Sequence, residues 1–172
     1  MTNISNFNKL SDYLPILNGS LFADLLVLFI VYYTPYFNSK YLMRWYENYR
    51  LSAVIADVLI LVIGIIIARY LYKYLFDSFS IIKFTGLVVA IQIIHDVLFY
   101  LFFSSLPRGT NKMMDLFKDY AKEVSGGAIA GDSFMIIIAT LASMIFANTN
   151  TNTNIISLIV MTYLVPYILY TR

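Results

Sequence analysis

Five long apolar segments constrain the fold of this chain more than any other feature of its sequence. They cover residues 17–37, 51–76, 81–103, 128–147 and 155–170. About 20 apolar residues in an α-helix cross a hydrocarbon core roughly 30 Å thick. Only 13% of the residues are charged, against about 25% in a typical soluble domain. We therefore expect an all-α polytopic membrane protein, with about five transmembrane helices forming a single domain over residues 1–172.

The last apolar segment leaves two alternatives open, because it is the shortest and contains Pro166. It either crosses the membrane with little tilt or re-enters on the same side. The tract before it, residues 148–154, has the sequence NTNTNTN. Low-complexity polar tracts of this kind are typical of flexible loops, so we expect a loop there.

A different kind of helix is predicted between the third and fourth segments, over residues 111–125. Apolar side chains recur there at helical spacing and charged ones occupy the other faces, which is the pattern of an amphipathic helix. Asn111 can cap its start and Gly126-Gly127 its end. We expect this helix to lie along the membrane surface or against the bundle and to contact a partner. The residues of its apolar face are Met113, Met114, Phe117, Tyr120 and Val124.

Basic residues beside the apolar segments predict the topology, since cytoplasmic loops carry an excess of Lys and Arg. Residues 38–50 mix basic with aromatic side chains, as membrane–water boundaries do. Four basic residues fall on the side of the N-terminus and eight on the other, which we therefore expect to be cytoplasmic, together with the C-terminus. The N-terminus and two glycosylation triplets, at Asn3 and Asn18, are then lumenal. The two basic sets are Lys9, Arg69, Lys73 and Lys83, and Lys40, Arg44, Arg50, Arg108, Lys112, Lys118, Lys122 and Arg172.

Four of the five segments contain an aspartate, although a carboxylate at the centre of a bilayer costs roughly 2.5–3.5 kcal/mol on insertion scales. At 1.5 Å rise per residue, Asp24 and Arg69 each lie about 10 Å from the lumenal end of their segment. We therefore predict that Asp24 and Arg69 form an ion pair.

A second polar layer is predicted near the cytoplasmic ends of the segments. Asp57, Asp96 and Asp132 lie about 6–12 Å from those ends, and His95 and Ser133 are their neighbours. We expect a polar pocket with the amphipathic helix as its lid. Three interpretations stay open: hydrogen bonds that only join helices, a proton or cation pathway, and a metal or catalytic site. Adjacent residues on a helix point about 100° apart, so only one of His95 and Asp96 is expected to face any site.

Several functions find no support in the sequence. The chain has no cysteine, which excludes disulfides, thiolate nucleophiles and cysteine metal sites. Its net charge is only +2 and its basic residues are scattered, so nucleic acid is not an expected partner. No nucleophile elbow, zinc-protease motif or phosphate loop occurs. We expect no enzyme activity, no catalytic residues and no metal or other cofactor.

The stretch from Pro107 to Ser133, PRGTNKMMDLFKDYAKEVSGGAIAGDS, is preceded by Ile94-His-Asp-Val-Leu-Phe-Tyr. Together they resemble uncharacterised multi-span membrane proteins encoded by large nucleocytoplasmic DNA viruses. The resemblance covers roughly residues 90–145 and implies a virion internal membrane or the host endoplasmic reticulum.

The leading functional hypothesis from the sequence is a non-enzymatic structural or assembly role. The expected partners are the lipid bilayer and either the capsid layer or other membrane proteins, and a homo-oligomer is an open alternative. The alternative function is a small proton or cation channel or transporter that uses Asp57, His95, Asp96 and Asp132.

Overall fold

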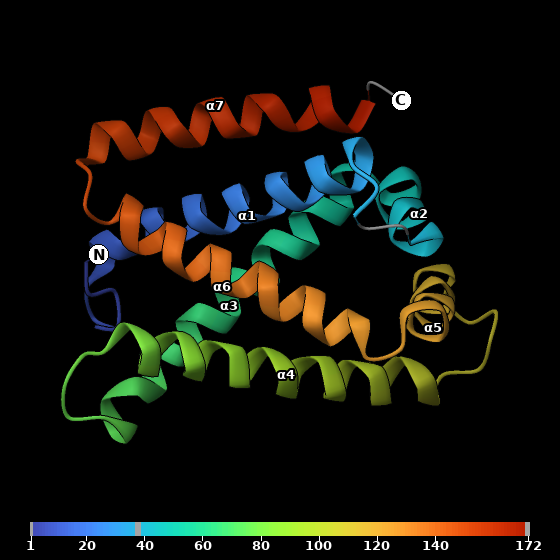
Figure 1. Cartoon of the computed structure of the whole chain (residues 1–172), viewed down its shortest axis with the longest axis horizontal. Helices are drawn as coiled ribbons and strands as arrows, with labels where there is room; N and C mark the ends of the chain where they lie inside the picture. Colours follow the sequence, from blue (N-terminus) through green and yellow to red (C-terminus); the bar gives the residue numbers. More distant parts are fainter. Residues whose placement is uncertain (1, 37–38, 171–172) are drawn as a thin grey trace.

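The computed structural model describes residues 2–36 and 39–170, and within these ranges the chain is all-helical, with no strand. A short 3-10 helix, η1, and seven α-helices follow one another along the chain (Figure 1). Their bounds are η1 Leu10–Asp12, α1 Tyr13–Tyr33, α2 Lys40–Tyr49, α3 Leu51–Leu75, α4 Ile81–Ser105, α5 Lys112–Val124, α6 Gly127–Phe146 and α7 Thr151–Tyr170.

Five of these helices are long and apolar enough to cross a membrane: η1 with α1, then α3, α4, α6 and α7. They alternate in direction, so the start of α1 and the end of α7 lie at opposite ends of the bundle (Figure 1). The prediction of an all-α protein with five membrane-crossing helices is confirmed. The bounds of α3, α4 and α6 agree with the predicted segments to within two residues.

Helix α1 packs against α3, α6 and α7, and its tightest contact is with α6. A Cβ atom added at Gly19 would lie 2.6 Å from the carbonyl oxygen of Ala139 and would also collide with Ser143. The two backbones can approach this closely only because position 19 has no side chain. Small residues at crossings let van der Waals contacts stabilise helix pairs in a bilayer, where hydrophobic driving force is weak.

The first helix begins earlier than the sequence predicted, at Tyr13 rather than residue 17. The prediction placed the polar residues near this end outside the span, but several of them are buried against other parts of the chain. Asn18 is fully buried, and its Nδ2 donates to the backbone oxygen of Asn154 at 2.9 Å. The helix ends at Tyr33, and the predicted end at Phe37 lies outside the described residues.

The predicted loop over residues 148–154 is wrong for its second half, because α7 begins at Thr151 and has 20 residues. Asn154 is 2% exposed, and its side-chain amide donates to the carbonyl oxygen of Phe146 at 3.0 Å. With this extra turn α7 is long enough to cross the membrane, so the re-entrant alternative is not adopted. Pro166 lies inside the helix without ending it.

Helices α2 and α5 pack against each other and cover one end of the bundle (Figure 1). We call this pair the cap. The sequence analysis placed residues 38–50 at a membrane boundary but did not predict α2, which spans only 10 residues. Helix α5 was predicted, and Asn111 caps it as expected, accepting from the amide of Met113 at 2.8 Å.

The end of α5 differs from the prediction that glycines would terminate it. Ser125 takes the positive φ, 49°, whereas Gly126 has φ of −64° and α6 already begins at Gly127. Arg50, between α2 and α3, has a positive φ of 46° as well. Arg50 alone joins α2 to α3, and Ser125 with Gly126 joins α5 to α6. Arg50 and Ser125 both have a φ that L-residues rarely adopt.

Candidate functional site

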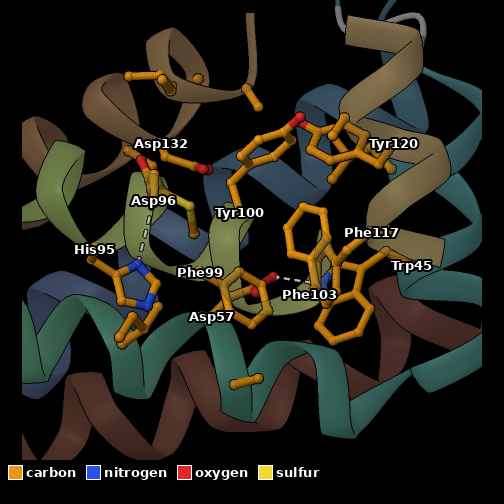
Figure 2. A pocket seen from close by; sticks show the side chains of 18 of the residues that line it. Trp45, Asp57, His95, Asp96, Phe99, Tyr100, Phe103, Phe117, Tyr120 and Asp132 are labelled. Carbon is orange, nitrogen blue, oxygen red and sulfur yellow. Dashed lines mark hydrogen bonds and ion pairs between the residues drawn. The ribbon is translucent and has the colours of Figure 1, made fainter. Parts of the chain in front are cut away.

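A cavity of about 730 Å³ lies directly beneath the cap. Its lining comes from α3, α4 and α6, and α2 and α5 cover one side of it, where Trp45, Phe117 and Tyr120 lie (Figure 2). Pockets of roughly 300–1,000 Å³ are typical of sites that bind small organic molecules. The cavity is therefore large enough to be a binding site and is the candidate site of this protein.

Three carboxylates from three different membrane-crossing helices line this cavity: Asp57 on α3, Asp96 on α4 and Asp132 on α6. They lie about 9, 14 and 8 Å from the cap ends of their helices at 1.5 Å per residue, so they share one layer. This is the convergence that the sequence predicted. Ser133, which the sequence analysis grouped with them, is not among the lining residues, since its neighbour Asp132 takes the inward direction.

His95 and Asp96 both line the cavity, although only one of them was expected to. His95 Nδ1 lies 3.2 Å from Asp96 Oδ1, so the imidazole bends toward its neighbour's carboxylate at the cavity wall. The His95 side chain is 39% exposed and that of Asp96 only 12%. The pair extends the polar surface of the cavity toward its edge.

The three carboxylates differ in the hydrogen bonds that they accept. Asp57 Oδ2 accepts from Trp45 Nε1 at 3.0 Å, and Asp96 Oδ1 accepts from Gln92 Nε2 at 2.7 Å. Asp96 Oδ2 is buried without a hydrogen-bond partner. Asp132 forms no hydrogen bond or ion pair with any residue that the structure describes. Two of the three acids therefore have oxygens that no protein group neutralises.

Aromatic rings form the opposite wall (Figure 2), where Phe117 on α5 is the central contact. Its ring centroid lies 4.9 Å from that of Trp45 and 5.2 Å from that of Phe99. Phe103 packs against it as well, at 6.2 Å. Asp96 and Asp132 thus face an aromatic cluster, whereas Asp57 lies within that cluster through its hydrogen bond from Trp45.

No lysine or arginine is among the described residues that line the cavity. The two nearby cations of the cap region are engaged elsewhere. Lys118 Nζ donates to the carbonyl oxygen of Leu106, and Arg108 pairs with Asp119 at 2.6 Å. Burial raises the pKa of the Tyr120 hydroxyl, and the charges of Asp132 and Asp57 raise it further. The cavity is consequently a region of negative potential.

The apolar face of α5 points into this cavity. Met113, Met114, Phe117 and Tyr120 line it, whereas Val124 lies beyond it, near Gly127. The sequence analysis expected this helix to lie along the membrane surface or against the bundle and to contact a partner. The four lining residues pack against the bundle, so the second alternative holds for them, and the expected contact with a partner stays a prediction. The predicted role of the helix as a lid agrees with the geometry.

Glu123 joins the two cap helices. Its carboxylate accepts from the hydroxyl of Ser39 and from the amides of Lys40, at 3.0 Å, and Tyr41, at 3.2 Å. These are the unpaired N–H groups at the start of α2, where a negative charge is favoured. Desolvation raises the pKa of Glu123, but these hydrogen bonds outweigh it and hold the pKa below its ordinary value. The ionised carboxylate therefore stabilises the closed cap.

Asp24 and Arg69 do not form the predicted ion pair. Arg69 is fully buried and its Nη2 lies 3.6 Å from Asp12 Oδ2; it also donates to the carbonyl oxygens of Asn6 and Lys9. The prediction failed because α1 begins before residue 17, which places Asp12 at the depth of Arg69 and moves Asp24 to about 16 Å from the start of α1.

Asp24 instead belongs to the cap end of the bundle. It is fully buried, and its Oδ1 accepts from the hydroxyl of Tyr46 on α2 at 3.2 Å. Burial raises the pKa of Tyr46, and the charges of Asp24 and Asp57 raise it further. Sequence reasoning missed this link because it left α2 unassigned as a helix.

Among the described residues no group of three His, Cys, Asp or Glu side chains is arranged to hold a metal ion. The set His95, Asp96 and Asp132, considered as ligands from the sequence, therefore does not form such a site. Comparison with protein-family models, with curated proteins and with solved structures finds no match. The resemblance to viral membrane proteins stays a prediction.

Proposed function

We propose that this chain is a small proton or cation transporter without enzyme activity, and that its substrate binds in the cavity beneath the cap. One observation carries the proposal: three carboxylates from three membrane-crossing helices line one cavity that has no lysine or arginine among its described lining residues. A cation is the ligand that such a cavity favours electrostatically.

Unpaired oxygens on two of these carboxylates favour a ligand-binding role over a purely structural one. Polar residues that only join helices form hydrogen bonds across the helix interface. Asp57 does so with Trp45, but Asp132 has no such partner and Asp96 Oδ2 has none either. Burying unpartnered carboxyl groups is unfavourable by several kcal/mol, and a bound cation or proton would offset that cost.

The two ends of the bundle favour a carrier over an open channel. The end away from the cap is filled by the buried Arg69, which the segment before α1 holds through Asn6, Lys9 and Asp12. At the other end the cap covers the cavity, which stays partly open along the edge where the His95 side chain is 39% exposed. Alternation of access between the two ends would carry the substrate across.

The distribution of basic residues supports a cytoplasmic cap. Seven of the eight basic residues assigned to the cytoplasmic side lie within the described cap end, and Arg172 lies outside the described residues. Lys9, Arg69, Lys73 and Lys83 belong to the opposite end. By the positive-inside rule the cap faces the cytoplasm and the start of α1 faces the lumen or the outside.

Charge movement on a solid-supported membrane tests the proposal. Proteoliposomes and protein-free liposomes are exposed to rapid jumps in H⁺, Na⁺, K⁺, tetramethylammonium and tetraphenylphosphonium, because binding or transport of any cation by the protein produces a current beyond that of the protein-free liposomes. We expect a current for at least one of them, and its loss in Asp96→Asn and Asp132→Asn. Asp77→Asn, in the exposed loop at the far end, is the matched control. Absence of current for every cation, or equal currents in the wild type and both cavity variants, would contradict the proposal.

A second candidate function is the assembly role, and the outer face of the cap favours it. Lys112 and Lys122 are exposed there, and α2 and α5 are the two helices of the described chain that do not belong to the membrane-crossing set. In a viral internal membrane this charged face would contact the capsid layer. If this is right, purified virions contain the protein and Lys112→Glu with Lys122→Glu lowers its incorporation while the cation currents persist. Virions that lack the protein would exclude the role.

A further inference from the structure

We propose that the cation bound in the capped cavity is a lipophilic organic cation, such as an aromatic phosphonium or a bulky ammonium compound, held between Asp132 and Asp96 on one side and the aromatic wall on the other. This inference rests on the proposed cation function and names the chemical class of the substrate. It follows from the size of the cavity, the division of its walls and its set of oxygen ligands.

The size of the cavity fits an organic molecule better than a bare ion. A volume of about 730 Å³ lies within the range of pockets that enclose drug-sized ligands, roughly 300–1,000 Å³. A sodium or potassium ion, or a proton, would leave most of this space without contacts. Met113, Met114 and Met135 also line the cavity, and flexible methionine side chains adapt readily to irregular organic ligands.

The number of available oxygen ligands also favours an organic cation over an inorganic one. Hard inorganic cations take about six to eight oxygens, but the described residues contain no cluster of three acidic or histidine ligands that could hold a metal ion. Asp96 Oδ1 is already shared with Gln92 and His95. What remains is the Asp132 carboxylate and the buried Asp96 Oδ2, which suffice to neutralise one diffuse positive charge.

The aromatic residues of the cavity would contact the apolar body of the organic cation. Trp45 and Phe117 lie across the cavity from Asp96 and Asp132 (Figure 2), and Phe99 contacts both Phe117 and His95. Aromatic faces attract cations whose charge is spread over a large apolar body. Asp132, Asp96 and His95 occupy the other side. The carboxylates would repel an anion of the same size and shape, and no lysine or arginine lines the described cavity to attract it.

Tetraphenylphosphonium and tetraphenylborate provide the test, because they match in size and shape and differ in the sign of their charge. Binding of tritiated tetraphenylphosphonium to the purified full-length protein is measured by scintillation proximity. Trp45 is the only tryptophan of the chain and lines the cavity, so its emission reports occupancy of this site separately from binding to detergent or lipid. We expect saturable binding with a change in Trp45 emission for the phosphonium and neither effect for the borate.

Three variants assign the binding to the cavity. Asp132→Asn and Asp96→Asn each lose about tenfold or more in affinity, since each removes a charge that contacts the cation. Asp115→Asn changes a carboxylate of α5 that does not line the cavity and leaves the affinity unchanged. Elution as a single species in gel filtration shows which variants are folded. If one cavity variant is misfolded, the other together with the phosphonium–borate comparison still decides the question.

The outcomes separate this inference from the proposed function. Cation currents for H⁺, Na⁺ or K⁺ without saturable phosphonium binding would overturn the organic class and leave the transporter proposal standing. Phosphonium binding without any cation current would support the ligand class and contradict transport. Equal binding of phosphonium and borate, or phosphonium binding that is unchanged in both Asp132→Asn and Asp96→Asn, would overturn the inference.

Discussion

Trp45 on α2 donates its indole N–H to the carboxylate of Asp57 on α3, at 3.0 Å, and so ties the cap to the wall of the cavity that it covers. The same ring packs on Phe117 of α5, at 4.9 Å. One residue thus contacts an acid of the site, the other cap helix and the cavity itself. Closure of the cap and the environment of the acids are physically linked through it.

Replacing Trp45 with Phe should lower the free energy of unfolding by about 1–3 kcal/mol, the cost of leaving a buried acceptor without its donor. The smaller ring keeps part of the contact with Phe117, so the loss of the hydrogen bond dominates. Tyr49→Phe, on the same helix, is the control, because no hydrogen bond of its hydroxyl is among those described. Thermal unfolding followed by circular dichroism measures both. Equal melting temperatures of the two variants would show that the hydrogen bond contributes nothing.

Gly19→Ala should destabilise the bundle by about 1–3 kcal/mol, the usual range for overpacking a tight contact. The added Cβ would lie 2.6 Å from the carbonyl oxygen of Ala139, which is backbone and has little room to move. Gly86→Ala is a matched control on α4, where an added Cβ meets nothing within 4 Å. We expect the melting temperature to fall for position 19 and to stay the same or rise for position 86. A similar shift at both positions would contradict the close crossing of α1 and α6.

The closed cap should depend on pH through Glu123. Because its pKa in the folded state lies below the ordinary value of 4.5, ionised Glu123 stabilises the fold above pH 4.5, and this contribution is lost as the pH falls through the folded-state pKa. Quenching of Trp45 emission by acrylamide should increase over that acidic range in the wild type. Glu123→Gln should show greater quenching already at neutral pH and a smaller acidic step.

The Arg108–Asp119 pair could open over the same pH range, because the hydrogen bond from Arg108 lowers the pKa of Asp119. Asp119→Asn separates the two contributions. It should keep the acidic step in quenching if Glu123 is the group that holds the cap. If the acidic step disappears in Asp119→Asn and stays unchanged in Glu123→Gln, the Arg108–Asp119 pair and not Glu123 holds the cap, which would contradict the prediction.

Ser125→Gly should raise the free energy of unfolding by up to about 1 kcal/mol, because φ of 49° is unfavourable for serine and accessible to glycine. Ser125→Ala keeps the Cβ and should leave the stability unchanged. Chemical or thermal unfolding of the two variants measures the difference. Equal stability of the two variants would mean that no strain is stored where α5 joins α6.

The membrane-crossing helices and the N-terminal capping residue of α5, Asn111, were predictable from sequence because their signals are local. Apolar length defines a span, and Asn111 accepts amides only two and three residues away. The shared layer of Asp57, Asp96 and Asp132 was also predictable, because each depth follows from one helix end and a fixed rise.

The remaining features depend on contacts between distant parts of the chain. Asp12 is buried only because α3 brings Arg69 beside it, and Asn154, in the first turn of α7, is held there by Asn18 on α1 and Phe146 on α6. Helix α2 receives its N-terminal carboxylate from Glu123, more than 80 residues later in the chain. Local cap signals exist as well, since Ser39 accepts from the amide of Leu42 at 3.0 Å and Asn150 from that of Thr153 at 2.8 Å. They were missed because the stretches around them read as a membrane boundary and as a low-complexity loop, and the distant partners cannot be found from either stretch alone.

The location of a bound cation tests most directly the claim that the capped cavity holds a cation against Asp96 and Asp132. Crystals of the full-length protein grown with tetraphenylarsonium allow the arsenic atom to be placed by its anomalous scattering. The account predicts an arsenic peak inside the cavity, between the carboxylates of Asp96 and Asp132 and the ring of Phe117, and no such peak in Asp132→Asn. An arsenic peak found only on the lipid-facing surface, or one in the cavity of wild type and Asp132→Asn alike, would contradict it.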